Sequence, residues 1–99
     1  LPYDIAMYGL LLEMIAKGNG LKPGKLIAQL GDCHLYNDHI EPARVYLARM
    51  QPAHMPELEL ASGMYSTMNN EVVIPKFEDI TIKNYNPKPA IPAPLSVGK

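Results

Sequence analysis

The chain has 99 residues, of which 47% are hydrophobic and 19% charged, so it is long enough for one domain and too apolar for a disordered segment. Nine basic and ten acidic side chains give a formal net charge of −1, which excludes the strongly basic surface that binds DNA or an anionic membrane. The single cysteine excludes an internal disulfide and is typical of a reducing compartment. Since the sequence shows no signal-peptide pattern and no apolar stretch near the roughly 18 residues of a membrane span, we expect a cytoplasmic protein with neither DNA nor a membrane as partner.

The first element predicted is a helix over residues 4–17. Asp4 is typical of an N-cap, and Gly18 begins the signal that ends the helix. Apolar side chains cover nearly the whole circumference, and only Glu13 and Lys17, spaced four residues apart, suit contact with water. A helix of this kind belongs in the middle of a larger protein. We therefore expect the chain to be cut from a longer one, or to bury this helix in an oligomer.

Short strands and one further helix are predicted for the middle of the chain. Alternating patterns predict strands at 25–36, 57–61, 72–74 and 77–85. In the last of these strands Ile80 and Ile82 are predicted to face inward. Asp38 and Glu41 form a capping-box pattern that predicts a second helix, running to about Met50.

The segment 31–39 concentrates polar side chains. If the strand ends here, Asp32, His34 and Tyr36 share one face, because successive side chains alternate, and Cys33 points the other way. Three hydrogen-bonding groups at the end of a strand indicate a ligand site. A polar trio on the solvent face of an edge strand is the alternative, and the pattern leaves both open.

A metal site and a reactive thiol are two further interpretations of the cysteine and the histidines. Cys33, His34, His39 and His54 include the ligand types that zinc favours. However, Cys33 and His34 face opposite sides of the predicted strand, and no C-x-x-C or H-E-x-x-H spacing occurs. We therefore expect no metal, and we expect Cys33 to be a buried, inert thiol.

The end of the chain, residues 86–99, is rich in proline and is predicted to be an extended tail, because proline suits neither a helix nor an inner strand. A polyproline ligand for an adaptor protein is one interpretation of such a tail. Only Pro89-Ala90-Ile91-Pro92 has a P-x-x-P spacing beside a basic residue.

Four segments in order carry a family pattern. They are L-P-Y-D-I-A-M-Y-G-L-L at 1–11, G-L-K-P-G at 20–24, G-D-C-H-L-Y-N-D-H at 31–39, and Y-N-P-K-P-A-I-P-A-P-L-S-V at 85–97. These segments resemble L-P-F-N-I-A-S-Y-A-L-L, G-L-x-P-G, G-D-x-H-I/L-Y-x-N-H and Y-x-P-H-P-x-I-K-A-P-V-A-I of the thymidylate synthase family. The resemblance covers about the C-terminal third of that family. It implies an α+β class, with residues 1–99 an incomplete C-terminal part of the fold in which a mixed β-sheet packs with a buried central helix and a second helix.

The resemblance also implies a chemistry. The family transfers a one-carbon group from 5,10-methylenetetrahydrofolate to C5 of a pyrimidine deoxynucleotide monophosphate, after a cysteine thiolate has added to C6 of the ring. That cysteine lies in an upstream P-C-H-like motif, as do the arginines that hold the phosphate, and this chain contains neither. Cys33 occupies the variable position of the G-D-x-H motif and does not inherit the role. We therefore expect these 99 residues alone to be inactive and the whole protein to be a homodimer that binds the nucleotide and the folate.

The resemblance assigns roles to three residues and one segment of this chain. His34 and Tyr36 would hydrogen-bond the deoxyribose 3′-hydroxyl. Tyr3 stands where the family has a Phe that contacts the aromatic part of the folate. The segment from Ala93 to Val97 would fold over the cofactor as a lid and exclude water from a reactive intermediate.

Three departures from the family pattern bear on the substrate and on closure. Asp4 stands where thymidylate synthases have an Asn whose carbonyl accepts from uracil N3–H and whose amide donates to O4. Cytosine reverses this edge, so a carboxyl group suits it, and the family's deoxycytidylate hydroxymethylases carry Asp here. Pro92 replaces a lysine, and Gly98-Lys99 extends past the usual end, so the closing contact is expected to differ.

The substrate remains open at this point, with dCMP hydroxymethylation as the favoured interpretation. An Asp that only caps the helix of a thymidylate synthase acting on dUMP is the first alternative. A non-catalytic relative that binds a nucleotide or RNA is the second.

Overall fold

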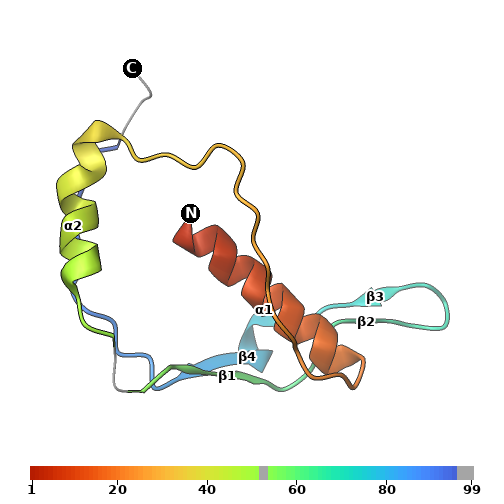
Figure 1. The fold of residues 1–99 in the computed structure, drawn as a ribbon. Helices are drawn as coiled ribbons and strands as arrows, with labels where there is room; N and C mark the ends of the chain where they lie inside the picture. The colour runs from red at the N-terminus through yellow and green to blue at the C-terminus, as the bar shows by residue number, and fades with distance from the viewer. Residues whose placement is uncertain (52–53, 96–99) are drawn as a thin grey trace. The chain divides into compact units, whose positions relative to one another are not determined.

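The computed structural model describes residues 1–51 and 54–95 (Figure 1). The chain divides into a first unit, formed by Leu1–Gln29 and Pro56–Tyr85, and a second unit, formed by Leu30–Met55 and Asn86–Lys99. Two α-helices, two short 3-10 helices and two small antiparallel sheets make up the regular structure of the described residues, which confirms the α+β class. None of these helices is long and apolar enough to cross a membrane.

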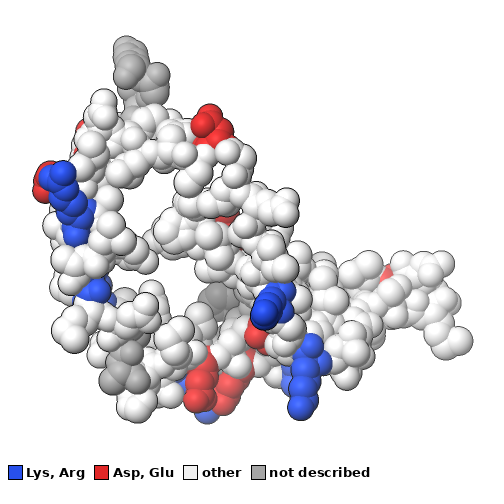
Figure 2. Space-filling model, in the orientation of Figure 1, with Lys and Arg blue, Asp and Glu red and all other residues white. Residues whose placement is uncertain are grey.

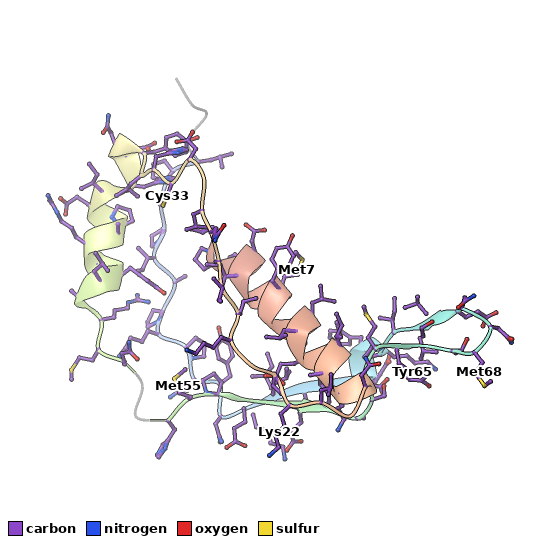
Figure 3. All side chains as sticks on the ribbon, turned by 45° about the vertical axis from the view of Figure 1, so that its right-hand side comes forward. Met7, Lys22, Cys33, Met55, Tyr65 and Met68 are labelled. Atoms are coloured by element: carbon purple, nitrogen blue, oxygen red, sulfur yellow. The ribbon has the colours of Figure 1, made fainter. Side chains whose placement is uncertain are left out.

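The first unit begins with α1, which spans Pro2–Gly18. Proline suits the first turn of a helix because its φ is already fixed near the helical value. Asp4 is therefore the third residue of α1 and not its N-cap, so the N-cap prediction is wrong. Ala16 is buried, with 5% of its surface exposed, while Met7 on the same helix remains 55% exposed (Figure 3). As its sequence predicts, this helix carries more apolar surface than the described chain covers.

The end of α1 is fixed against the loop that joins β1 and β2. The Met64 N–H donates to the Met14 carbonyl at 2.8 Å. Asn19 reaches back with its amide nitrogen to the Ile15 carbonyl at 2.8 Å and across to the Met64 carbonyl at 3.3 Å. Gly63 is buried beside this junction, where a Cβ would overlap backbone atoms of the helix end.

The larger sheet pairs β1 (Glu57–Leu60) with β4 (Ile80–Lys83) in antiparallel register. The Lys83 ammonium lies 2.8 Å from a Glu59 carboxylate oxygen on this sheet. Strands were expected over both segments, and both are confirmed, although a single turn of 3-10 helix occupies the start of the second, before β4. Ile80 is half-buried, but Ile82 is 58% exposed, so the inward prediction is wrong for Ile82.

The smaller sheet is a hairpin of β2 (Tyr65–Ser66) and β3 (Val72–Val73). The strand at 72–74 was expected, whereas β2 was not, because its surroundings show no period. The Thr67 N–H donates to the Glu71 carbonyl at 2.7 Å and thereby closes the hairpin. Figure 3 shows Met68 at the tip, where its side chain is fully exposed.

The second unit contains the short 3-10 helix η1 (Asn37–His39), which continues directly into α2 (Ile40–Ala48). The predicted capping box is wrong, because η1 precedes α2 and leaves His39 as the N-cap, with no side-chain capping bond. Glu41 pairs with Arg44 one turn further along α2. Residues 86–95, called the tail below, have no helix or strand, as the prolines predict.

The strand predicted at 25–36 is wrong for the described chain, which forms no strand there and bends at residues 31–32. A strand exists only when a neighbour accepts and donates its backbone hydrogen bonds, and the two sheets of the described part contain only β1 with β4 and β2 with β3. The same loss of neighbours leaves Cys33 exposed, so the expected burial of its thiol is also wrong.

Candidate functional site

Three aromatic rings of the second unit, those of His34, Tyr36 and His39, form a row that we call the ring cluster. The His34 and Tyr36 ring centroids lie 5.2 Å apart at an interplanar angle of 78°. The Tyr36 and His39 centroids lie 5.9 Å apart at 81°. Both contacts have the edge-to-face geometry that aromatic rings prefer. The cluster therefore holds the Tyr36 ring between two imidazoles.

The local backbone explains why these residues meet. His34 and Tyr36 are two positions apart in a segment without helix or strand, and the contact between their rings shows that both side chains lie on one side of the chain. The chain then turns into η1, where the His39 N–H donates to the Tyr36 carbonyl at 3.0 Å. The predicted grouping of His34 and Tyr36 is thus present, although the predicted strand is not.

Asp32 fixes the imidazole of His34. The His34 Nδ1 atom lies 2.8 Å from the Asp32 carbonyl oxygen and 3.5 Å from its Oδ1. A carbonyl oxygen only accepts, so Nδ1 carries the proton of this hydrogen bond. In the neutral ring, Nε2 is then left as an acceptor, and about half of the side chain is exposed. Together with the Tyr36 hydroxyl, the site offers one acceptor and one group that can donate or accept, which suits an alcohol ligand.

Two contacts that the sequence did not predict join the tail to the two ends of α2. His39 Nε2 lies 2.6 Å from the Pro94 carbonyl oxygen, and the Arg49 guanidinium lies 2.7 Å from the Pro89 carbonyl oxygen. Ala93, one of the expected lid residues, is exposed immediately before Pro94. Val97, the other, lies outside the described residues.

The remaining expected site residues belong to the first unit. Tyr3 and Asp4 lie in the first turn of α1, where the Tyr3 side chain is 90% exposed and the Asp4 side chain 72% exposed. An acidic residue in the first turn interacts favourably with the helix dipole, by about 0.3–1 kcal/mol. The structure therefore presents an aromatic ring and a carboxylate side by side in the sequence, both accessible to a ligand.

The electrostatic character of the chain is mixed. Figure 2 shows Lys and Arg side chains interspersed with Asp and Glu in small groups on the face drawn. Within residues 1–51 and 54–95, no three His, Cys, Asp or Glu side chains come together as a metal site requires. The groups that form the candidate site are hydrogen-bonding atoms and aromatic rings.

Comparison with known proteins identifies the family of this chain. The thymidylate synthase family model matches residues 1–97, and the chain belongs to that family. It is 42% identical over 96 residues to the thymidylate synthases of Listeria monocytogenes serotype 4a (strain HCC23) and serotype 4b (strains CLIP80459 and F2365). Each alignment covers 97% of this chain and 29% of the relative, so the chain spans less than a third of the length of these relatives. No solved structure matches it.

Proposed function

We propose that this chain is the C-terminal part of a homodimeric, cytoplasmic enzyme that transfers a one-carbon group from 5,10-methylenetetrahydrofolate to C5 of a pyrimidine deoxynucleotide monophosphate. Family membership over residues 1–97 supports the reaction class. The exposed apolar side chains of α1, such as Met7 at 55% and Ile15 at 42%, support burial of this helix by the rest of the domain and its partner subunit. The 99 residues alone are inactive in this proposal, because the nucleophilic cysteine and the phosphate-binding arginines lie upstream.

The proposed substrate is dCMP, and the single observation that carries this choice is Asp4. Its carboxylate does not cap α1, and most of its side chain is open to a ligand. A carboxyl group accepts from the cytosine N4 amino group and shares a proton with N3, whereas an ionised carboxylate would face O4 of uracil with no donor between them. Buried sites reject such unpaired arrangements by orders of magnitude. Methylation of dUMP is the second candidate, and the names of the Listeria relatives favour it.

The proposed product is the hydroxymethyl nucleotide, formed when water adds to the methylene intermediate. Water addition leaves the folate as tetrahydrofolate. Methyl transfer without another reductant instead takes a hydride from the folate and leaves dihydrofolate. The two reactions therefore differ in a measurable product.

The complete enzyme is tested with 5-tritiated dCMP and 5-tritiated dUMP in the presence of methylenetetrahydrofolate. We expect tritium release from dCMP without formation of dihydrofolate, which is followed by its absorbance. Release from dUMP alone would overturn the cytosine assignment. Release from neither nucleotide, together with measurable nucleotide binding, would indicate a non-catalytic relative.

The ring cluster is proposed to bind the deoxyribose 3′-hydroxyl, with His34 Nε2 accepting its hydrogen bond and the Tyr36 hydroxyl beside it. Tyr36→Phe removes only the hydroxyl, and we expect nucleotide affinity to fall about fivefold, the effect of one hydrogen bond. His34→Ala removes the acceptor and one side of the cluster, so we expect a loss of about tenfold. Calorimetric titration of the complete enzyme with nucleotide measures both.

A 3′-deoxy nucleotide and a control variant make this test specific. The wild type should bind the 3′-deoxy analogue more weakly than the parent nucleotide, and Tyr36→Phe should reduce that difference. Tyr46→Phe removes a hydroxyl from an exposed tyrosine of α2 outside the cluster and should change neither affinity. Unchanged nucleotide affinity in both cluster variants would remove the sugar contact from the proposal.

A further inference from the structure

Two side chains at the ends of α2 hold the tail. The Arg49 guanidinium, directly after the last residue of α2, donates to the Pro89 carbonyl at 2.7 Å. His39 Nε2, directly before the first residue of α2, donates to the Pro94 carbonyl at 2.6 Å. The tail therefore runs antiparallel to α2, and Figures 1 and 3 show its trace alongside this helix.

The spacing of the two contacts matches the length of the helix. From His39 to Arg49 the helical rise of 1.5 Å per residue gives about 15 Å. From Pro89 to Pro94 an extended proline-rich chain, at 3.1 Å per residue, also covers about 15 Å. The distance between the two donors along α2 thus matches the distance between the two tail carbonyls that they bond.

The composition of the tail explains why side chains, and not backbone N–H groups, donate hydrogen bonds to its carbonyls. Four of its residues are prolines, which have no backbone N–H, so the tail cannot pair as a strand and presents mainly acceptors. Its carbonyls then need donors from elsewhere, and an arginine and a histidine supply them. Because proline also restricts the unfolded chain, ordering such a tail costs less conformational entropy than ordering a flexible one.

His39 links the tail to the ring cluster. Its ring packs edge-to-face on Tyr36, with centroids 5.9 Å apart, while its Nε2 bonds the Pro94 carbonyl. The same imidazole therefore contacts the group proposed to bind the sugar and the segment that the family resemblance leads us to expect over the folate. A nucleotide that orders Tyr36 would also favour the bound position of the tail, because the two share this contact.

We propose that His39 and Arg49 are positioning residues that fix the register of the tail along α2 and so determine where Ala93 and Pro94 meet the one-carbon donor. This inference rests on the proposed function for its effect on the folate, and on the described contacts alone for the attachment of the tail. The attachment and its effect on catalysis are therefore measured separately.

Attachment is measured by proteolysis of the complete protein with elastase, which cleaves after small residues. The bond between Ala90 and Ile91 lies between the two contacts, and mass spectrometry follows its cleavage. Arg49→Ala and His39→Ala should each raise the cleavage rate about fivefold, the effect of losing one hydrogen bond. His39→Gln keeps a donor in place of Nε2 and should restore slow cleavage. Arg44→Ala is the matched control, because Arg44 is exposed on the same helix and pairs only with Glu41 among the described residues.

For catalysis, we expect the loss of a tail contact to affect the KM for the folate more than the affinity for the nucleotide. Arg49→Ala should raise the KM for methylenetetrahydrofolate about fivefold and lower nucleotide affinity by a smaller factor, since Arg49 bonds the tail and reaches the ring cluster only through it. If cleavage of Arg49→Ala and His39→Ala matches that of Arg44→Ala, the attachment is overturned. If cleavage rises while the folate KM stays constant, the positioning role is overturned. If the wild type uses neither folate nor nucleotide, the proposed function fails, and the proteolysis still decides whether the tail is held.

Discussion

Asp4→Asn is expected to reverse the base preference of the complete enzyme from dCMP to dUMP. An Asn amide donates to uracil O4 while its carbonyl accepts from N3–H, and against cytosine the same amide faces the N4 amino group, donor against donor. Since each mismatched pair leaves a buried polar group unsatisfied, we expect the ratio of the kcat/KM values for the two nucleotides to change on the order of a hundredfold or more. Tritium release from the two 5-tritiated nucleotides measures this ratio.

The control for this experiment is Glu13→Gln, which makes the same change of charge on the same helix, away from its first turn. It should leave the ratio of kcat/KM values as in the wild type. A loss of turnover on both nucleotides in Asp4→Asn, with the ratio constant, would show that Asp4 supports the fold of the site without reading the base. Unchanged turnover on both nucleotides would show that Asp4 has no role in base recognition.

The elements that sequence patterns predict well are those that local interactions stabilise. The apolar run of α1, with Pro2 at its first position and Gly18 at its last, specifies a helix without reference to the rest of the chain. The alternation in β1 and β4 also predicts both strands, and both form because each has the other as its partner in the sheet. By contrast, the Asp38 capping pattern fails because residues 37–39 adopt a 3-10 turn, which moves the N-cap of α2 by one position, from Asp38 to His39.

The segment 25–36 shows where the local pattern stops being sufficient. Its alternation is that of a strand, yet all of its residues are exposed and none is paired in the described chain. A strand is a property of a sheet, so its formation depends on neighbours that the sequence of the segment does not contain. Exposed apolar residues such as Ile27, at 78%, mark the segment as a candidate for pairing with the remainder of the proposed domain.

The candidate site likewise combines contacts between positions close in the sequence, which were predicted, with contacts between distant positions, which were not. His34 and Tyr36 are brought together by a spacing of two, which the sequence displays directly. The contacts of His39 with Pro94 and of Arg49 with Pro89 join positions 55 and 40 residues apart, and no periodicity relates them. Only the lack of donors in the proline-rich tail could have indicated that side chains elsewhere must bond its carbonyls.

Gly63→Ala is expected to destabilise the protein by about 3 kcal/mol or more, at the upper end of what overpacking costs. Gly63 is buried, and an added Cβ would overlap the backbone nitrogen of Gly18 and atoms of Lys17. These are backbone atoms of a helix end, so no side-chain rotation can relieve the overlap. Relief requires separation of the loop from α1, which breaks the Met64 to Met14 hydrogen bond of 2.8 Å. Urea unfolding of the complete protein at constant concentration measures the change.

Gly9→Ala is the matched control, since it adds the same methyl group within α1, where no heavy atom of the described chain lies within 4 Å of the new Cβ. Alanine favours the helix over glycine by about 1 kcal/mol, so this variant should be equally or more stable than the wild type. Opposite shifts of the two unfolding midpoints would show that contact with the loop, and not the added methyl group itself, is responsible. Equal midpoints for Gly63→Ala and Gly9→Ala would show that the helix end and the loop are not packed as described, because the same methyl group would then be tolerated at both positions.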